Sequence, residues 1–156
     1  MSRSFEPVRK EARVRLDVGE AFRLFTEEMA AWWPLETHSV AGERARTVIF
    51  EPRRDGRIFE VDIDGAESRW GTVLAYDPPT RVVFSWHPGR TAETAGTVEV
   101  TFRQAGNGTV VNLTHTGWEK LGEAAEATRA GYDTGWDLVF GDRYVAAAGR
   151  ATPSAD

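Results

Sequence analysis

Turn-forming residues recur at short intervals between about residues 46 and 115 and separate six short runs rich in β-branched and aromatic residues. Asp-Gly and Asn-Gly pairs supply the positive φ angles of tight hairpins, and the proline-containing pairs end strands. The intervals are too short for the crossover helices that parallel strands require. The middle of the chain is therefore predicted to form an antiparallel meander with strands at 47–51, 57–63, 69–76, 81–87, 97–103 and 109–116.

The fifth run of this meander alternates between apolar and polar residues with a period of two, which is typical of a strand with one buried face. The face expected to pack against a C-terminal helix carries Val98, Val100 and Phe102. The face expected to contact water carries Thr97, Glu99 and Thr101. One strand thus fixes which side of the predicted sheet is the core.

A strand and a helix are predicted ahead of the meander. Residues 8–16 alternate, with charged side chains mainly on one side, and indicate a half-buried strand. Asp17 and Glu20 have the spacing of a capping box, so a helix should begin there. Apolar residues at helical spacing then extend to Trp33, and Pro34 is expected to end the helix.

Helical spacing returns after Trp118. Residues 119–129 are rich in Ala and Glu, and they are followed by five residues spaced three or four apart that should share one face: Tyr132, Trp136, Val139, Phe140 and Arg143. Glycines between them either are tolerated or leave room for a ligand. The order of elements predicts an α+β fold in which a curved antiparallel sheet wraps around a long C-terminal helix, with space between the two layers.

Composition narrows the classes of function. The chain has 156 residues, a size typical of one domain, taken here as residues 1–156. A net charge of −5 disfavours nucleic-acid binding, and the absence of Cys excludes disulfides and thiolate sites. No signal peptide or membrane-spanning run is recognisable, so a cytoplasmic protein without a membrane partner is expected. Six Trp and eight Phe are many for this length and suggest an aromatic core or an apolar pocket.

Six motifs carry a resemblance to a known family: Trp32-Trp33-Pro34-Leu35-Glu36-Thr37-His38-Ser39-Val40, Phe50-Glu51-Pro52-Arg53, Trp70-Gly71-Thr72-Val73, Pro78-Pro79-Thr80-Arg81, Phe84-Ser85-Trp86, and Gly131-Tyr132 with Gly135-Trp136. Over about residues 8–147 the chain resembles the activator of Hsp-90 ATPase homologue-like family of the SRPBCC (START, Bet v 1-like) superfamily. The resemblance implies a helix-grip fold with one cavity between sheet and C-terminal helix. The Trp-Trp-Pro and Gly-Trp motifs also resemble self-sacrificing enediyne-resistance proteins.

The three histidines are the candidate polar groups. His115 follows Val111 and Leu113 at a period of two, so it should point into the sheet interior, either as a ligand anchor or as a structural group bonded to helix backbone or an acid. His38 lies in a loop after the Trp-Trp-Pro motif, where binding groups are common. His87 is expected to face solvent. Glu60 would supply a buried carboxylate if it faced inward, and its register is ambiguous.

No motif for nucleophilic catalysis, phosphate binding or metal coordination is present, so no catalytic residue, metal or cofactor is predicted. A ligand site is predicted instead from the aromatic surplus and from the faces that the family fold places around its cavity. Its residues are Trp32, Trp33, His38, Trp70, Trp86, Phe102, Leu113, His115, Tyr132, Trp136 and Phe140.

Three functions remain open at this stage, because the superfamily includes carriers, polyketide cyclases and co-chaperone domains. The first is binding of a small apolar molecule, aromatic or lipid-like. The protein that binds it could also form a weak homodimer. The second is an enzyme of the polyketide cyclase or aromatase type in which a histidine acts as acid or base. The third is a stress-related interaction module of the chaperone-activator kind, or a self-sacrifice resistance protein. Eukaryotic activators carry an additional chaperone-binding domain, for which 156 residues leave no room.

Overall fold

The structure is a computed structural model and describes residues 5–151, without the side chain of Ala151. Seven antiparallel strands form one sheet in the order β1-β7-β6-β5-β4-β3-β2. The strands are β1 (Val8–Val14), β2 (Ala45–Phe50), β3 (Arg57–Asp62), β4 (Glu67–Asp77), β5 (Arg81–Trp86), β6 (Gly96–Ala105) and β7 (Gly108–Thr116). The predicted antiparallel meander is confirmed, and β1 extends the sheet by pairing with β7.

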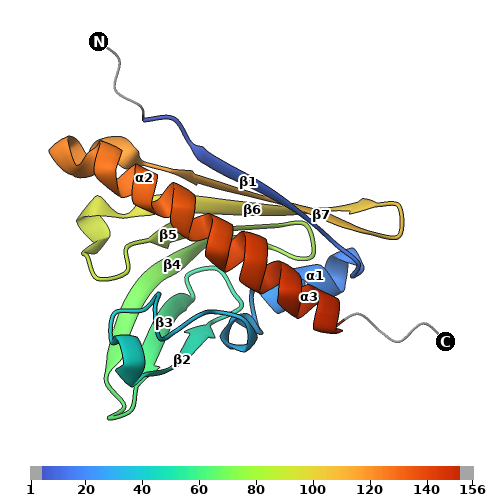
Figure 1. Cartoon of the computed structure of the whole chain (residues 1–156), viewed down its shortest axis with the longest axis horizontal. Coiled ribbons are helices and arrows are strands. Elements are labelled where there is room, and N and C mark those ends of the chain that lie inside the picture. The colour runs from blue at the N-terminus through green and yellow to red at the C-terminus, as the bar shows by residue number, and fades with distance from the viewer. Residues whose placement is uncertain (1–4, 152–156) are drawn as a thin grey trace.

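The helices lie on one face of this curved sheet (Figure 1). A continuous helical run crosses the sheet and consists of α2 (Ala125–Trp136), the π-helical segment η5 (Asp137–Tyr144) and α3 (Val145–Ala151). The other helices are α1 (Val18–Phe25) and four short 3-10 turns, η1 (Met29–Ala31), η2 (Gly42–Arg44), η3 (Ala92–Thr94) and η4 (Trp118–Ala124). The chain therefore has the predicted α+β helix-grip fold.

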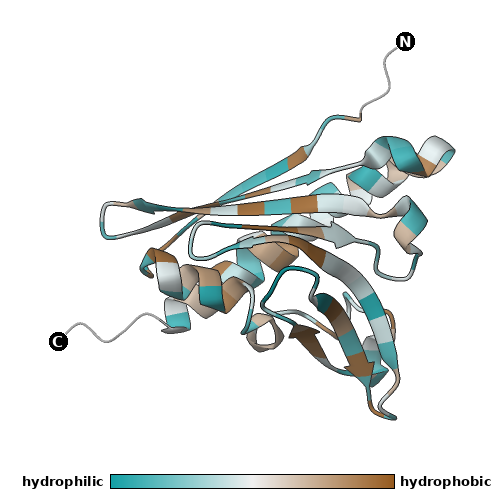
Figure 2. Ribbon diagram, turned by 180° about the vertical axis from the view of Figure 1, so that it is seen from behind, coloured by the Kyte–Doolittle hydropathy of each residue, from teal (hydrophilic) through white to brown (hydrophobic). Residues whose placement is uncertain are grey.

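The alternation predicted for residues 97–102 is confirmed. Val98, Val100 and Phe102 are at most 3% exposed and belong to the core between sheet and helix. The intervening Thr97, Glu99 and Thr101 are only partly buried. Figure 2 shows apolar and polar positions alternating along the strands. The short hairpins and this period of two are enough to fix the core side of the sheet.

The first helix is shorter than expected. The capping box forms as predicted, with Asp17 accepting from the Glu20 amide at 2.7 Å. The helix ends at Phe25 rather than at Pro34, because the backbone leaves helical geometry at Thr26 and the chain that follows turns to pack against the rest of the core. The irregular segment that follows carries the two tryptophans of the Trp-Trp-Pro motif into the core, where both are at most 8% exposed.

The face predicted for the C-terminal helix needs one correction. Trp136, Val139 and Phe140 are buried as expected, but Arg143 is exposed and Tyr144 takes the buried position. The π-helical geometry of η5 explains the shift, since each turn holds more residues than an α-turn and the spacing along the buried face widens to four. The Tyr144 hydroxyl donates to the Ala21 carbonyl at 2.8 Å and joins this helix to α1.

His87 was expected to face solvent, and this is wrong: its side chain is 5% exposed. The ladder of β5 ends at Trp86, so the alternation does not extend to the next residue. The His87 amide instead donates to the Trp70 carbonyl at 2.6 Å, and its Nδ1 lies 3.3 Å from the Arg90 carbonyl. The turn between β5 and η3 therefore folds this ring inward.

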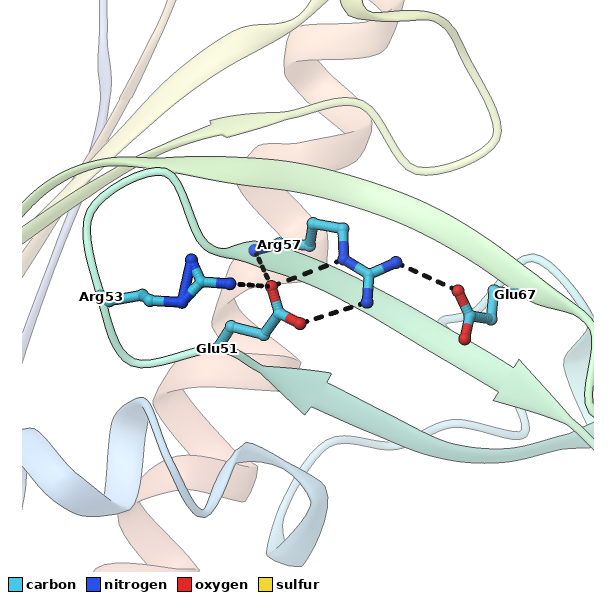
Figure 3. Close-up of polar contacts among 4 residues, drawn as sticks. All are labelled: Glu51, Arg53, Arg57 and Glu67. Atoms are coloured by element: carbon cyan, nitrogen blue, oxygen red, sulfur yellow. Dashed lines mark hydrogen bonds and ion pairs between the residues drawn. The ribbon is translucent and has the colours of Figure 1, made fainter.

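An ionic network holds β2, β3 and β4 together (Figure 3). Glu51 accepts from the Arg57 amide at 2.7 Å and pairs with its guanidinium at 3.1 Å. The same guanidinium pairs with Glu67 on β4 at 3.1 Å and packs over the Phe59 ring, while Arg53 approaches Glu51 at 3.5 Å. Hydrogen bonds from Arg57 hold the pKa of Glu51 below its usual value. These contacts fasten the hairpins that carry Glu60 and Trp70.

Candidate functional site

A cavity of about 250 Å³ lies between the C-terminal helix, the end of β5 and the loop after Trp33. Three segments far apart in the sequence meet there. The residues that line it are Trp33, Thr37, His38, Ser39, Val40, Trp86, Pro88, Gly89, Tyr132, Gly135, Trp136 and Val139. Most of this wall is apolar, which is typical of a pocket for a small organic molecule.

Three indole rings form one side of the cavity. The ring centroids of Trp33 and Trp86 are 5.6 Å apart, and Trp136 lies 5.8 Å from Trp86 and 6.1 Å from Trp33. Trp70 packs behind them, 5.0 Å from Trp33 and 5.6 Å from Trp86. Because neighbouring rings hold each indole in place, this side of the cavity is a fixed aromatic wall.

Gly135 leaves the helical side of the cavity open. A Cβ atom built on this glycine would have no heavy atom within 4 Å. A glycine within a helix costs roughly 1 kcal/mol relative to alanine, so the residue is unfavourable for the helix itself. Its position beside Trp136 keeps space free for a bound molecule.

Hydrogen bonds to the backbone fix the loop that closes the cavity. The Trp33 indole donates to the His38 carbonyl at 2.7 Å. The Glu60 carboxylate, on β3 and 1% exposed, accepts from the amides of Val40 at 2.6 Å and Ala41 at 2.8 Å. It also accepts from the Trp70 indole at 2.6 Å. One buried carboxylate thus links the loop to the indole that supports the aromatic wall.

His38 is the partly exposed histidine of the cavity wall. Its Nδ1 lies 2.8 Å from the Thr37 hydroxyl, and its backbone amide donates to the Pro34 carbonyl at 2.9 Å. Burial and the nearby positive charge of Arg143 hold its pKa below the usual value of 6.5. The ring is therefore mainly neutral at pH 7 and presents Nε2 without a partner among the described residues.

His115 points inward as predicted, with 0% exposure, but it lies behind Trp136 and does not line the cavity. Its partner is neither helix backbone nor an acid: the Trp136 indole donates to its Nδ1 at 3.0 Å. Nε2 must then carry the proton, and no described residue accepts from it. Burial, with a smaller contribution from Arg90, lowers the pKa of His115 to about 3.

Arg90, in the turn after β5, contacts Tyr132. Its guanidinium carbon is 6.0 Å from the Tyr132 ring centroid, and one Nη atom is 3.4 Å from the Tyr132 hydroxyl. The other Nη atom is buried, with no acceptor among the described residues. This cation and neutral His115 both contact Tyr132, and neither of them lines the cavity.

The structure brings five of the eleven predicted site residues into the cavity wall: Trp33, His38, Trp86, Tyr132 and Trp136. The other six lie in the core or behind the wall: Trp32, Trp70, Phe102, Leu113, His115 and Phe140. Trp70 and His115 still contact lining residues directly. Ligand contact by any of the eleven stays a prediction.

Sequence reasoning did not select seven of the lining residues: Thr37, Ser39, Val40, Pro88, Gly89, Gly135 and Val139. Two signals were available. The polar stretch Thr37-His38-Ser39 follows the Trp-Trp-Pro motif directly, and Gly135 interrupts a helix beside Trp136. Pro88 and Gly89 carry only turn chemistry, so nothing in their own sequence distinguishes them from other hairpin residues.

A family model for the Activator of Hsp90 ATPase homolog 1-like protein matches residues 15–146. The chain belongs to this family. The Hsp90 activator homologue-like assignment agrees with the resemblance noted from the motifs and with the helix-grip fold. The match establishes the fold of the chain but not its activity, because one fold can carry many activities.

Solved structures of similar proteins cover almost the whole chain. An anthrahydroquino-gamma-pyrone synthase, Txn09, complexed with a compound designated SUM, is 31% identical, with a TM-score of 0.62 over 94% of this chain and 99% of that chain. The self-sacrificing resistance protein CalC from Micromonospora echinospora is 22% identical, with a TM-score of 0.72 over 97% and 99%. Protein MLL2253 from Mesorhizobium loti is 16% identical, with a TM-score of 0.66 over 93% and 98%. The latter two show the fold alone.

A comparison with curated proteins gives no match. Within residues 5–151, no three His, Asp or Glu side chains are close enough together to hold a metal ion. None of the helices that the structure describes is long and apolar enough to cross a membrane.

Proposed function

We propose that this protein binds a flat, ring-containing small molecule in the cavity between the sheet and the C-terminal helix. The observation that carries the proposal is the indole wall of Trp33, Trp86 and Trp136 facing open space beside Gly135. Stacking on fixed indoles and burial of apolar area both favour an aromatic ligand. The family fold, which typically encloses a hydrophobic ligand, supports the same assignment.

The size of the cavity favours a compact ligand. Its volume of about 250 Å³ is close to the lower end of the range for small-molecule sites, roughly 300–1,000 Å³. A molecule of two or three fused rings suits this space better than a long acyl chain. The polar groups at the wall, His38 and the Tyr132 hydroxyl, favour a ring that carries a hydroxyl or carbonyl oxygen.

Ring-forming catalysis on an aromatic polyketide-like substrate is the second candidate. It is favoured by the 31% identity to a pyrone synthase over nearly the full length of both chains. Such an enzyme would use the same cavity to fold its substrate and hold reacting atoms together. Binding and catalysis therefore share one site and differ in whether the bound molecule changes.

Tryptophan fluorescence tests the binding proposal, because three of the six tryptophans line the cavity. Titration with a panel of hydroxylated naphthalenes, anthraquinones and fatty acids should give saturable quenching with the bicyclic and tricyclic compounds and little with the fatty acids. If no compound of the panel changes the fluorescence, the proposal fails.

The variant Gly135→Leu makes this test specific, since Gly135 lines the cavity and a Cβ atom built on it meets no heavy atom within 4 Å. We expect it to weaken binding of the best ring compound by more than about tenfold while the fold stays intact. Gly141→Leu is the matched control: it is an exposed helical glycine outside the cavity wall, also with free space around a built Cβ. Equal affinities in the two variants would contradict the assigned site.

A further inference from the structure

His38 is held more firmly than a loop side chain normally is. Its backbone amide donates to Pro34, its carbonyl accepts from the Trp33 indole, and its Nδ1 contacts the Thr37 hydroxyl. The next two loop amides are bound by Glu60. The imidazole therefore has a fixed position at the cavity wall before any ligand arrives, which is a condition for efficient catalysis by a side chain.

Hydrogen-bond counting assigns the tautomer of this ring. The Thr37 hydroxyl also lies 3.4 Å from the Pro34 carbonyl. If Nδ1 carries the proton and donates to Thr37, the hydroxyl is free to donate to Pro34, and both bonds form. If Nε2 carries the proton, the hydroxyl must donate to Nδ1 and the bond to Pro34 is lost. The first arrangement is favoured and leaves a lone pair on Nε2.

We propose that Nε2 of His38 is a general base that removes a proton from an aromatic or heteroaromatic molecule bound against the indole wall. The proposal rests on the proposed function, because it requires the ring compound to occupy the cavity. It assigns a class of substrate as well: a flat bicyclic or tricyclic ring with an acidic C–H or O–H at the edge that faces the loop after Trp33.

The other two histidines do not fit this role. His115 is fully buried behind Trp136, and its Nδ1 lone pair is occupied by the indole N–H. His87 is folded under its own turn and does not line the cavity. Among the histidines, only His38 combines a free nitrogen lone pair with a place in the cavity wall.

The surroundings of His38 also favour the product of proton removal. Besides burial, the charge of Arg143, an exposed residue of η5, reaches the His38 ring and lowers its pKa. The positive charge of Arg143 disfavours the imidazolium but stabilises an anion formed on the ligand. A phenolate or enolate formed beside His38 would therefore be stabilised by this positive charge, in a pocket where electrostatic interactions are stronger than in water.

A probe reaction tests the base without knowledge of the natural substrate. 5-Nitrobenzisoxazole is a flat bicyclic compound with one acidic C–H at carbon 3. When Nε2 takes this proton, the C–H electron pair becomes the third bond of a nitrile and the ring N–O bond breaks. The electron pair of the N–O bond stays on the oxygen, which becomes a coloured phenolate. Atoms and electrons therefore balance without a cofactor, and the absorbance of the phenolate measures the reaction.

We expect the wild-type protein to convert this probe faster than an equal concentration of free imidazole. His38→Ala should lower kcat/KM by about 100-fold, the lower end of the range for general-base catalysis, with little change in quenching by the bound probe. Free imidazole added to His38→Ala should restore a saturable rate, which a merely structural role of His38 would not predict. Thr37→Val, which removes the orienting hydroxyl, should give a smaller loss than His38→Ala.

The outcomes separate the two proposals. Quenching by the probe with no turnover above background, or with turnover that His38→Ala leaves unchanged, overturns the general base and leaves the binding proposal intact. If the probe causes neither quenching nor turnover, both proposals are overturned. Gly135→Leu should lose quenching and turnover together, while Gly141→Leu should retain both. Turnover that survives in Gly135→Leu would place the reaction outside the cavity and overturn the assignment.

Discussion

The space between the sheet and the C-terminal helix is filled differently at its two ends, although both ends are built from aromatic side chains. Near α1, Phe25 is 0% exposed and packs against Trp32, Phe84, Phe102, Phe140 and Tyr144, at centroid distances of 5.3–6.4 Å. Near the end of β5, three indoles instead border a cavity of about 250 Å³.

The difference comes from what lies opposite the rings rather than from the rings themselves. At the closed end, α1 inserts its apolar face between sheet and helix and fills the space. At the open end the opposing positions are Gly135 and the loop around His38, which Glu60 and Trp33 hold in place. A high aromatic content therefore does not by itself distinguish a core from a pocket.

Replacing one ring at each end is expected to have the largest effect. Phe25→Ala should lower the free energy of unfolding by about 3–5 kcal/mol, because its ring is surrounded on all sides. Trp136→Ala should cost less, since one side of its indole faces the cavity, but should reduce quenching by ring compounds. Denaturant unfolding followed by circular dichroism, together with a ligand titration, measures both. Equal losses of stability with unchanged ligand binding would show that Trp136 is simply core.

Lowering the pH should weaken the open end through His115. Its pKa is about 3 in the folded protein and near 6.5 when unfolded. Between these values the unfolded chain binds a proton that the folded chain does not, so stability present at neutral pH is lost as the pH falls through this window. We expect this histidine to remove about 2 kcal/mol from the unfolding free energy between pH 7 and pH 5.

The matched variant for this prediction is His115→Asn, whose Oδ1 lies at about the position of Nδ1 and can still accept from the Trp136 indole. The difference between wild type and variant isolates His115 from the carboxylates, which also titrate in acid. If the wild type loses no more unfolding free energy than the variant between pH 7 and pH 5, His115 titrates normally in the folded state.

The smallest effect concerns the ion pairs that attach the helix to β1. Lys10 lies 2.6 Å from Asp133 and 2.8 Å from Asp137. Burial opposes its charge, but hydrogen bonds to the two carboxylates outweigh burial and raise its pKa. Because both carboxylates are largely exposed, Lys10→Met should cost only about 0.5–1 kcal/mol, and high salt should reduce the difference between wild type and variant. A larger, salt-independent loss would contradict this interpretation.

The local features of the fold could be predicted from the sequence because they depend on short-range chemistry. The hairpin turns, the alternation at Val98 to Phe102 and the capping box of Asp17 involve residues that are close in the chain. The early end of the first helix and the π-helical turn before Tyr144 could not be predicted, since packing against distant elements overrides helical spacing there. The prediction that His87 faces solvent was wrong, because this residue lies one position beyond the end of β5 and no longer follows the alternation of the strand.

The candidate site divides in the same way. His38 and four aromatic lining residues could be chosen from the sequence and the family resemblance, but the same reasoning also chose residues that lie in the core or behind the wall. The contribution of Glu60 could not, since its partners are backbone amides twenty and nineteen positions away. The position of His115 behind Trp136 likewise requires knowing how helix and sheet face each other.

The attachment of the loop by Glu60 has a consequence for how this protein could diversify. The carboxylate binds main-chain amides, which are the same whatever side chains positions 40 and 41 carry. Positions 40 and 41 can therefore change their side chains without displacing the loop, as long as Glu60, the Trp70 indole and the Ser39 hydroxyl, which accepts from the Gly42 amide, are kept. Randomising Thr37 and Val40 should accordingly yield folded variants with altered ligand preference, so the chemistry of the cavity rim can evolve separately from the scaffold that carries it.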